Sequence, residues 1–250
     1  MVDAAGSGAR PAGPGLDGPW IMAQRWHDLL FAHWPVAADA LAAALPPGLE
    51  LDTHDGRAWL GVIPFRMSGV RLRGLPACPG PGAFPELNVR TYVRHRGRPG
   101  VWFSSLDAAS AVAVGVARRW FRLPYFRAAM HCRALPDGGI DYACRRTHPG
   151  APPAELRASY GPDGSPAAAL PGSLEHFLVE RYSLFADAGG GRLLRGDIDH
   201  RPWPLQPARA QIEVNSMAAA AGFDLPDEAP RLHFVRRLDV RIGRPRRVEP

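Results

Sequence analysis

Four polar side chains alternate along one predicted β-strand, and their types suit acid–base chemistry and anion binding. In the segment Glu86–Arg94, the two-residue period of a strand places Glu86, Asn88, Arg90 and Tyr92 on one face and apolar residues or threonine on the other. A carboxylate close to an amide and a guanidinium can transfer a proton and orient an anion. Two interpretations are open: this face lines the inside of a closed sheet, or it faces water.

A second candidate segment, residues 117–126, has the sequence ARRWFRLPYF, with three arginines among four aromatic residues. Arg118 and Arg119 fall in the last turn of a predicted helix, where cations suit the helix dipole. Trp120 and Phe121 suit either the core or a stacking surface. A nucleic-acid binder needs basic residues gathered on one face or in a run, and here they are scattered, so we expect no nucleic-acid partner.

The chain contains no lysine, because all 30 of its Lys and Arg residues are arginines. Abundant Ala, Gly, Pro and Arg are typical of a GC-rich genome, which accounts for the absence. The chemical consequence holds whatever the cause. Side-chain Schiff bases, a pyridoxal-phosphate lysine and a Walker phosphate loop each need an ε-amine and are excluded. We expect no cofactor.

The histidines and the Pro-rich segment 200–204 supply further candidates. His27 and His33 are six residues apart, a spacing that fits no common metal motif, and no metal is expected. His33 is assigned to ligand binding, although a histidine on an apolar strand is often only a hydrogen-bonded core residue. Arg201 and Trp203 alternate and can edge one pocket, and Trp203 is assigned to it.

The composition and charge of the chain limit which class of protein it can be. The formal net charge is +6, and no apolar run approaches the ~20 residues of a membrane span, so no membrane partner is expected. Three cysteines without a Cys-x-x-Cys motif indicate a reducing compartment, and the cytoplasm is the expected location. Residues 1–21 are rich in Gly, Ala and Pro, lack the apolar segment of a secretory signal and are predicted to be a disordered tail.

The remaining elements are predicted from periodicity and turn residues. Strands are expected over Arg25–Val36, Val101–Leu106, Ala154–Tyr160, Arg192–Ile198, Ala208–Val214 and Leu238–Ile242. Hairpins are expected to join Leu49–Asp52 to Arg57–Met67 and Phe126–Leu135 to Ile140–Thr147. Helices are expected over Ala37–Leu45 and over Ala108 to about Trp120, the second capped by Asp107 and ended by Pro124. Gly74–Pro85 is a predicted loop, and Leu174–Leu184 stays ambiguous.

Many short strands and few helices predict an α+β fold that is predominantly antiparallel β. No internal repeat or linker divides the chain, so residues 22–250 are expected to form a single domain. The hairpins favour a sheet that is a closed or partly open barrel.

The segment around Tyr125 resembles acetoacetate decarboxylase-like enzymes. That family has Gly-Arg-Glu, four residues, and then Pro-Lys-Lys, where this chain has Ala117-Arg118-Arg119, four residues, and then Pro124-Tyr125-Phe126. Arg118 and Pro124 agree, whereas Tyr125 stands at the position of the lysine that forms the Schiff base. By strand order, Glu86 corresponds to the acidic residue that faces this lysine. The resemblance therefore implies a hydroxyl where relatives place an amine.

A wider resemblance, over residues 24–206, is to the YqjF-like family of bacterial proteins, domain of unknown function 2071. The segments that carry it are Phe31–Val36, Glu86–Val93, Gly100–Asp107, Leu123–Tyr125, Glu180–Tyr182 and His200–Pro204. That family is grouped with the acetoacetate decarboxylase-like fold, which is the fold implied here.

These observations predict a pocket for a small anionic or carbonyl-bearing metabolite. Glu86 is assigned as acid or base and Tyr125 as hydrogen-bond donor, while Arg90 and Arg118 hold the anion. An enzyme without Schiff-base chemistry and a non-catalytic binding protein are both open, with an arginine-rich nucleic-acid binder as the third alternative. Assembly into a homo-oligomer is left open.

Overall fold

The computed structural model describes residues 13–76 and 83–249. Residues 1–12 of the expected N-terminal tail and residues 77–82 of the expected loop lie outside the described part. Residues 13–21 lie along the edge of the sheet. There Asp17 forms ion pairs with Arg195 at 3.2 Å and Arg246 at 3.4 Å, and the Ile21 amide donates to the carbonyl of Ile242.

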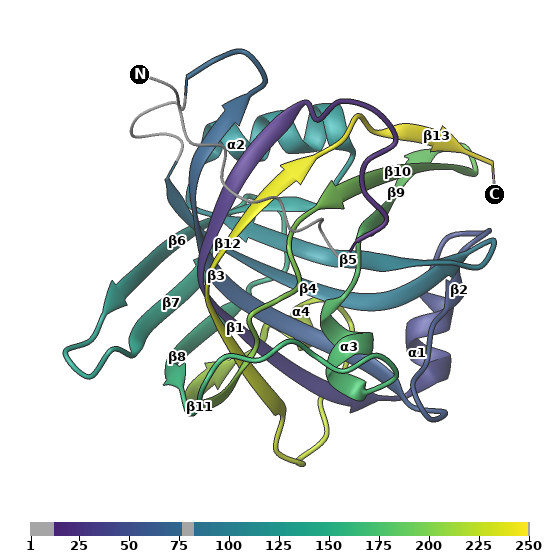
Figure 1. Ribbon diagram of the computed structural model, residues 1–250. Helices are drawn as coiled ribbons and strands as arrows, with labels where there is room; N and C mark the ends of the chain where they lie inside the picture. Colours follow the sequence, from purple (N-terminus) through teal and green to yellow (C-terminus); the bar gives the residue numbers. More distant parts are fainter. Residues whose placement is uncertain (1–12, 77–82, 250) are drawn as a thin grey trace.

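Strands dominate the described chain (Figure 1). They are β1 (Met22–Val36), β2 (Glu50–Leu51), β3 (Ala58–Leu72), β4 (Phe84–His95), β5 (Arg98–Ala108), β6 (Tyr125–Ala134), β7 (Ile140–Arg146), β8 (Glu155–Pro162), β9 (Ser183–Gly189), β10 (Arg192–Asp199), β11 (Gln206–Asn215), β12 (Arg231–Ile242) and β13 (Arg246–Val248). The helices are α1 (Ala38–Ala43), α2 (Ala111–Val116), the π-helical turn η1 (Ala117–Phe121), α3 (Leu174–Val179) and α4 (Met217–Ala220).

The strands form one mostly antiparallel sheet that curls into a ring. Its order is β13-β10-β9-β5-β6-β7-β8-β11-β12-β1-β3-β4-β2, and β4 also pairs with β5, which joins distant parts of the sheet. Strand β5 is parallel to β6 and to β9, and the other pairings are antiparallel. A predominantly antiparallel fold with a few short helices is therefore confirmed.

Two hydrophobic clusters lie on opposite faces of β1, β3 and β4. The first fills the inside of the ring and includes Phe31, Phe65, Tyr92, Tyr125 and Trp203. The second lies between the outer face of these strands and the layer β6-β7-β8-β11, and its members include Trp34, Val62, Leu87, Tyr142 and Phe234. Because β4 is covered on both sides, its polar face cannot be a wet surface.

One predicted hairpin is wrong. The segment Leu49–Asp52 does not pair with the strand that follows it; instead Glu50 and Leu51 pair with Arg94 and Val93 of β4. The turn 54–57 is closed only by a bridge between His54 and Arg57. The turn residues predict the reversal correctly, but they do not determine which strand edge is free to accept β2.

The predicted helix over Ala108–Trp120 begins later and is shorter than expected. Strand β5 continues to Ala108, and the N-cap is Ser110, whose hydroxyl accepts from the Ala113 amide at 3.2 Å. Asp107 is not a cap: it lies in β5 and forms an ion pair with Arg146. The carboxylate gains more from a buried guanidinium than from exposed helix amides.

Most other predicted elements are confirmed within a few residues, but the strand predicted over Leu238–Ile242 is longer than expected, because β12 begins at Arg231. The hairpin of Phe126–Leu135 and Ile140–Thr147 is β6 and β7, and the ambiguous segment from Leu174 divides into helix α3 and the start of β9. None of the helices in the described part of the chain has the length and apolar character needed to cross a bilayer.

Candidate functional site

The inner face of β4 carries the predicted polar residues, and all of them are buried. Glu86, Asn88, Arg90 and Tyr92 have exposed fractions of 3%, 6%, 9% and 0%. Strands β3 and β5 flank β4 along this stretch, so its backbone hydrogen bonds are satisfied and its side chains face the ring interior. The interpretation in which this face lines the inside of the ring is confirmed, and the wet-surface alternative is wrong.

Glu86 and Tyr125 meet inside the ring. The phenol of Tyr125 donates to Oε2 of Glu86 at 3.0 Å. The pairing of β4 with β5 places Glu86 opposite Ala108, and the parallel pairing of β5 with β6 places Tyr125 opposite Leu106. Two residues distant in sequence are thus held across a single intervening strand.

Burial controls the protonation of this pair. Loss of hydration raises the pKa of Glu86 to about 8, with a smaller contribution from the Asp107 charge, and the hydrogen bond from Tyr125 offsets part of this rise. Burial also holds the pKa of Tyr125 well above its ordinary value, and the neighbouring Glu86 raises it further. At neutral pH the pair therefore contains a largely protonated carboxyl group that changes charge just above neutrality.

Arg90 is a buried cation without a carboxylate partner in the described part of the chain. Its Nη2 donates to the carbonyl of Leu178 in α3 at 2.9 Å and to the Tyr92 hydroxyl at 3.5 Å. Its guanidinium lies 5.5 Å from the ring centre of Phe31, and its Nε has no hydrogen-bond partner. Among the described residues, no Asp or Glu forms an ion pair with Arg90. Buried charges in proteins are usually paired, so this arginine is suited to a bound anion.

His33 is linked to Arg90 through Tyr92. Nε2 of His33 lies 2.6 Å from the Tyr92 hydroxyl. Burial and the Arg90 charge hold the pKa of His33 well below its ordinary value, so the imidazole is neutral. Among the described residues, Nε2 of His33 is the acceptor within reach of the Tyr92 proton, so we assign that proton to the hydrogen bond with Nε2 and the imidazole proton to Nδ1. That Nδ1 is buried and has no partner among the described residues.

Three unpartnered N–H donors therefore surround Phe31. Besides Arg90 Nε and His33 Nδ1, the indole Nε1 of Trp203 is buried and unpaired. The Trp203 ring packs edge-on against Phe31 at 5.0 Å, and the His33 ring stacks on Phe31 at 6.1 Å. Buried polar groups in proteins are normally hydrogen-bonded. A cluster of unpaired donors beside an uncompensated cation suits a carboxylate or another small anion.

Asn88 lies between the two groups along β4. Its Oδ1 is buried and unpaired. Residues two apart on a strand are separated by roughly 7 Å, so Glu86 and Arg90 stand roughly 13 Å apart at their backbones. Both side chains lie on the same inner face of β4, with Asn88 between them.

Two predicted residues lie elsewhere. The Arg118 guanidinium donates to the backbone carbonyl of Tyr125 at 2.7 Å and lies over Phe126, which points to the opposite face of β6 from Tyr125. Arg118 is thus not brought to the Glu86 carboxyl. His27, a candidate by residue type, would share a face with Phe31 in a regular strand, since four residues separate them. Asp28 instead adopts a left-handed conformation with φ of 54°, and His27 turns outward to Ser68.

Sequence reasoning did not place helix α3 over the site. Arg181 anchors this helix: its Nη1 donates to Asp52 and its Nε to the carbonyl of Phe177, each at 2.6 Å. Neighbouring residues of an extended segment point to opposite sides, so the sequence Glu180-Arg181-Tyr182 contains a signal for one inward-pointing polar side chain. In the described part of the chain, no group of three or more His, Cys, Asp or Glu residues is placed to hold a metal ion.

Solved structures with the same fold are acetoacetate decarboxylase-like proteins. The acetoacetate decarboxylase from Legionella pneumophila matches with a TM-score of 0.64 at 15% identity, covering 99% of this chain and 98% of that one. The enduracididine biosynthesis enzyme MppR, solved in complex with pyruvate, matches with a TM-score of 0.61 at 17% identity, covering 96% and 98%. At these identities the likeness shows the fold.

Sequence similarity identifies the family of this chain. The model of the DUF2071 family, described as "Uncharacterized conserved protein (COG2071)", matches residues 23–239. The protein YqjF of Bacillus subtilis (strain 168) is 46% identical over 224 residues, which cover 90% of this chain and 91% of YqjF. The chain therefore belongs to the DUF2071 family.

Proposed function

We propose that this protein binds a small 2-oxo acid inside the ring and exchanges a proton at the carbon next to its carbonyl group. The observation that carries this proposal is the buried row on β4, which runs from a carboxyl with a raised pKa at Glu86 to an unpaired guanidinium at Arg90. The same fold in MppR holds pyruvate, a small 2-oxo acid, which supports this ligand class.

Arg90 holds the ligand carboxylate in this proposal. A guanidinium fork matches a carboxylate geometrically, and a buried charge-assisted hydrogen bond is stronger than an exposed one. The indole of Trp203 and the imidazole of His33 add donors beside Phe31. Because the site is enclosed by strands, it excludes a nucleic-acid backbone.

Glu86 and Tyr125 perform the proton transfer. The ionised Glu86 carboxylate takes a proton from C3 of the ligand, and the electron pair of that C–H bond moves into the carbonyl, which becomes an enolate. The Tyr125 hydroxyl donates a hydrogen bond to the enolate oxygen. Glu86 then returns a proton from solvent to C3. No ε-amine is needed, which agrees with a chain that has no lysine.

The test is solvent exchange into pyruvate. Purified protein is incubated with pyruvate in D₂O, and loss of the methyl proton signal is followed by NMR while pyruvate binding is measured by saturation transfer. We expect exchange with the wild type at a rate that rises with pH up to about 8, where Glu86 ionises. Glu86→Gln should abolish exchange and keep binding, and Arg90→Gln should weaken binding at least 10-fold.

Arg157→Gln is the matched control, because Arg157 is exposed on β8, away from the ring interior. It should leave binding and exchange unchanged. Failure of the wild type to bind pyruvate and 2-oxobutanoate, or equal binding by the Arg90→Gln variant, would contradict the proposal.

A non-catalytic binding protein is the second candidate. It is favoured by one observation, that a tyrosine stands in the segment where the resemblance places a nucleophilic lysine. Under this alternative, wild type binds pyruvate through Arg90 but shows no deuterium uptake above that of the protein-free control at any pH between 6 and 9.

A further inference from the structure

The wall of the ring has a gap beside β12. This strand pairs with β11 at His233 and Phe234 and with β10 at Arg241 and Ile242. In the described structure, residues 235–240 between these pairings are bonded to β1 on one side and to no strand on the other. The non-strand segment 200–204 borders the gap.

A groove with a volume of about 960 Å³ lies at this gap. Leu238 and Val240 from β12 line it together with His200 and Pro204 from the facing segment. Its volume is in the range of pockets for drug-sized or nucleotide-sized molecules. It is separate from the Glu86–Tyr125 pair, neither member of which lines it.

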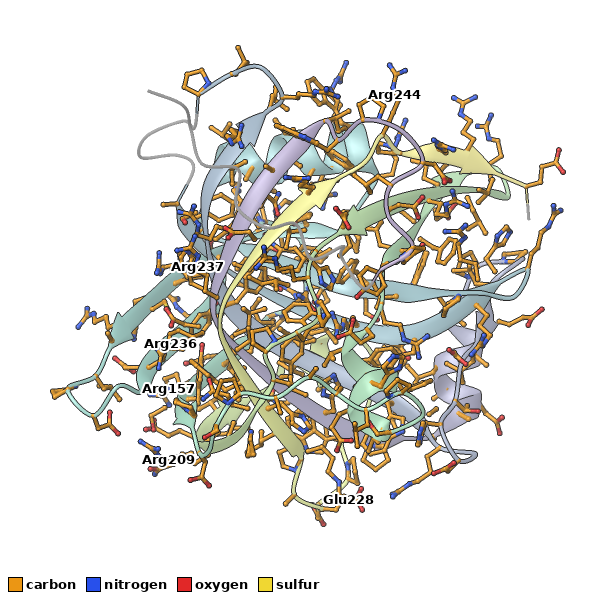
Figure 2. All side chains as sticks on the ribbon, viewed as in Figure 1. Arg157, Arg209, Glu228, Arg236, Arg237 and Arg244 are labelled. Carbon is orange, nitrogen blue, oxygen red and sulfur yellow. The ribbon has the colours of Figure 1, made fainter. Side chains whose placement is uncertain are left out.

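Arginines dominate the charge of the groove. Arg25, Arg71, Arg201, Arg237 and Arg241 line it, against the two aspartates Asp199 and Asp239. Five positive and two negative charges leave an excess of three. Figure 2 shows Arg237 at the side of the ring where β12 passes β1 and β3, above Arg236, Arg157 and Arg209 in this view.

Three of these arginines have no acidic partner among residues 13–76 and 83–249. Asp239 is shared by Arg25 at 2.9 Å and Arg237 at 3.3 Å. Within the described residues, Arg71, Arg201 and Arg241 form no ion pair; Arg71 lies 5.1 Å from the ring of Trp20. The pairing register sets Arg71 on β3 and Arg241 on β12 directly opposite Ala23 of β1, so both arginines lie on the two strands that flank β1 and share its outward orientation at this position.

The groove also borders the aromatic contacts that lead inward. His200, which lines it, packs against Trp203 at 5.0 Å, and Trp203 packs against Phe31 at the same distance. The Arg90 guanidinium lies on Phe31. A chain of ring contacts therefore runs from the groove to the interior anion site.

We propose that this groove is a second anion site that binds the phosphate portion of a small phosphorylated metabolite. Clustered guanidinium groups bind phosphate through paired hydrogen bonds. Their combined positive charge matches a multiply charged phosphate better than a singly charged carboxylate. The proposal goes beyond the 2-oxo acid site, and it holds whether or not Glu86 transfers a proton.

The probe is pyrophosphate, titrated by calorimetry at low ionic strength. The variant Arg71→Gln/Arg201→Gln/Arg241→Gln should bind pyrophosphate at least 10-fold more weakly than wild type. The matched control Arg119→Gln/Arg133→Gln/Arg145→Gln changes three exposed arginines elsewhere and lowers the net charge equally. It should stay within about 2-fold of wild type. Thermal melting confirms that both variants fold.

Arg90→Gln separates this site from the interior one, because it should weaken pyruvate binding and leave pyrophosphate binding unchanged. Equal weakening in the two triple variants would overturn the proposal in favour of a general charge effect. Absence of pyrophosphate binding to wild type would also overturn it. Displacement of pyrophosphate by a short DNA duplex, with a steep salt dependence, would assign the groove to nucleic acid instead.

Discussion

At the scale of single residues, Glu86 links function to stability. Its pKa rises from an ordinary 4.5 to about 8 on folding, because the carboxyl is buried. Between these values the folded protein keeps a proton that the unfolded chain has lost, so the contribution of Glu86 to stability is greatest below pH 4.5 and falls as pH rises toward 8. A site that needs a carboxyl poised near neutrality thus destabilises the fold at alkaline pH.

Replacing Glu86 with glutamine should remove this pH dependence. The amide resembles the protonated carboxyl but cannot ionise. Between pH 5 and 8, the free energy of unfolding of the variant should therefore rise relative to that of the wild type by up to ~1.4 kcal/mol for each pH unit. Urea unfolding at several pH values measures it. Glu213→Gln, at an exposed position on β11, serves as control and should run parallel to wild type. If the plot of unfolding free energy against pH for Glu86→Gln also ran parallel to that of the wild type, Glu86 would have an ordinary pKa.

At the scale of elements, one buried ion pair joins the two layers of the sheet. Asp107 on β5 accepts two hydrogen bonds of 2.7 Å from Nε and Nη2 of Arg146 on β7. Both side chains are almost fully buried. Removing one partner of such a pair leaves an uncompensated charge, which costs more than the pair itself contributes.

We therefore expect Arg146→Met to reduce the free energy of unfolding by about 3–5 kcal/mol. The double variant Asp107→Asn/Arg146→Met removes both charges and should recover part of that loss. Chemical denaturation of the wild type, both single variants and the double variant gives the coupling energy. Additive single effects would mean that the two side chains act independently in the folded protein.

At the scale of the whole molecule, closure of the ring depends on a close approach of β5 to β9. A Cβ built on Gly100 would lie 2.7 Å from the carbonyl oxygen of Ser183 and 2.6 Å from the ring of Phe185. The backbone contact cannot be relieved by a change of side-chain rotamer. Glycine at this position lets the parallel pairing of Val101 with Leu184 form.

Gly100→Ala should therefore lower stability by about 1–3 kcal/mol, as overpacked substitutions do. Gly115→Ala is the matched control, because a Cβ there meets nothing within 4 Å and the residue lies in helix α2. That control should be stabilising by about 0.5–1 kcal/mol. Thermal denaturation of both variants tests this, and a neutral Gly100→Ala would show that β9 can shift.

The sequence by itself determined the local features of this protein. Residue periodicity placed Glu86, Asn88, Arg90 and Tyr92 on one face of a strand, and turn residues located the β6–β7 hairpin. These features depend on residues within a few positions of one another. The missing lysines excluded Schiff-base chemistry through composition alone.

Only the tertiary structure decided that the polar face of β4 is buried as well as its apolar face, and which residues meet. Glu86 and Tyr125 are 39 positions apart, as are Asp107 and Arg146. The choice of β4 as the partner of β2 and the outward turn of Arg118 likewise depend on which edges and carbonyls are nearby after folding. A local pattern specifies the direction of a side chain relative to its own strand. The residue that this side chain contacts depends on which distant strands pack beside it after folding. The number of residues between two positions does not predict the distance between them in the folded protein.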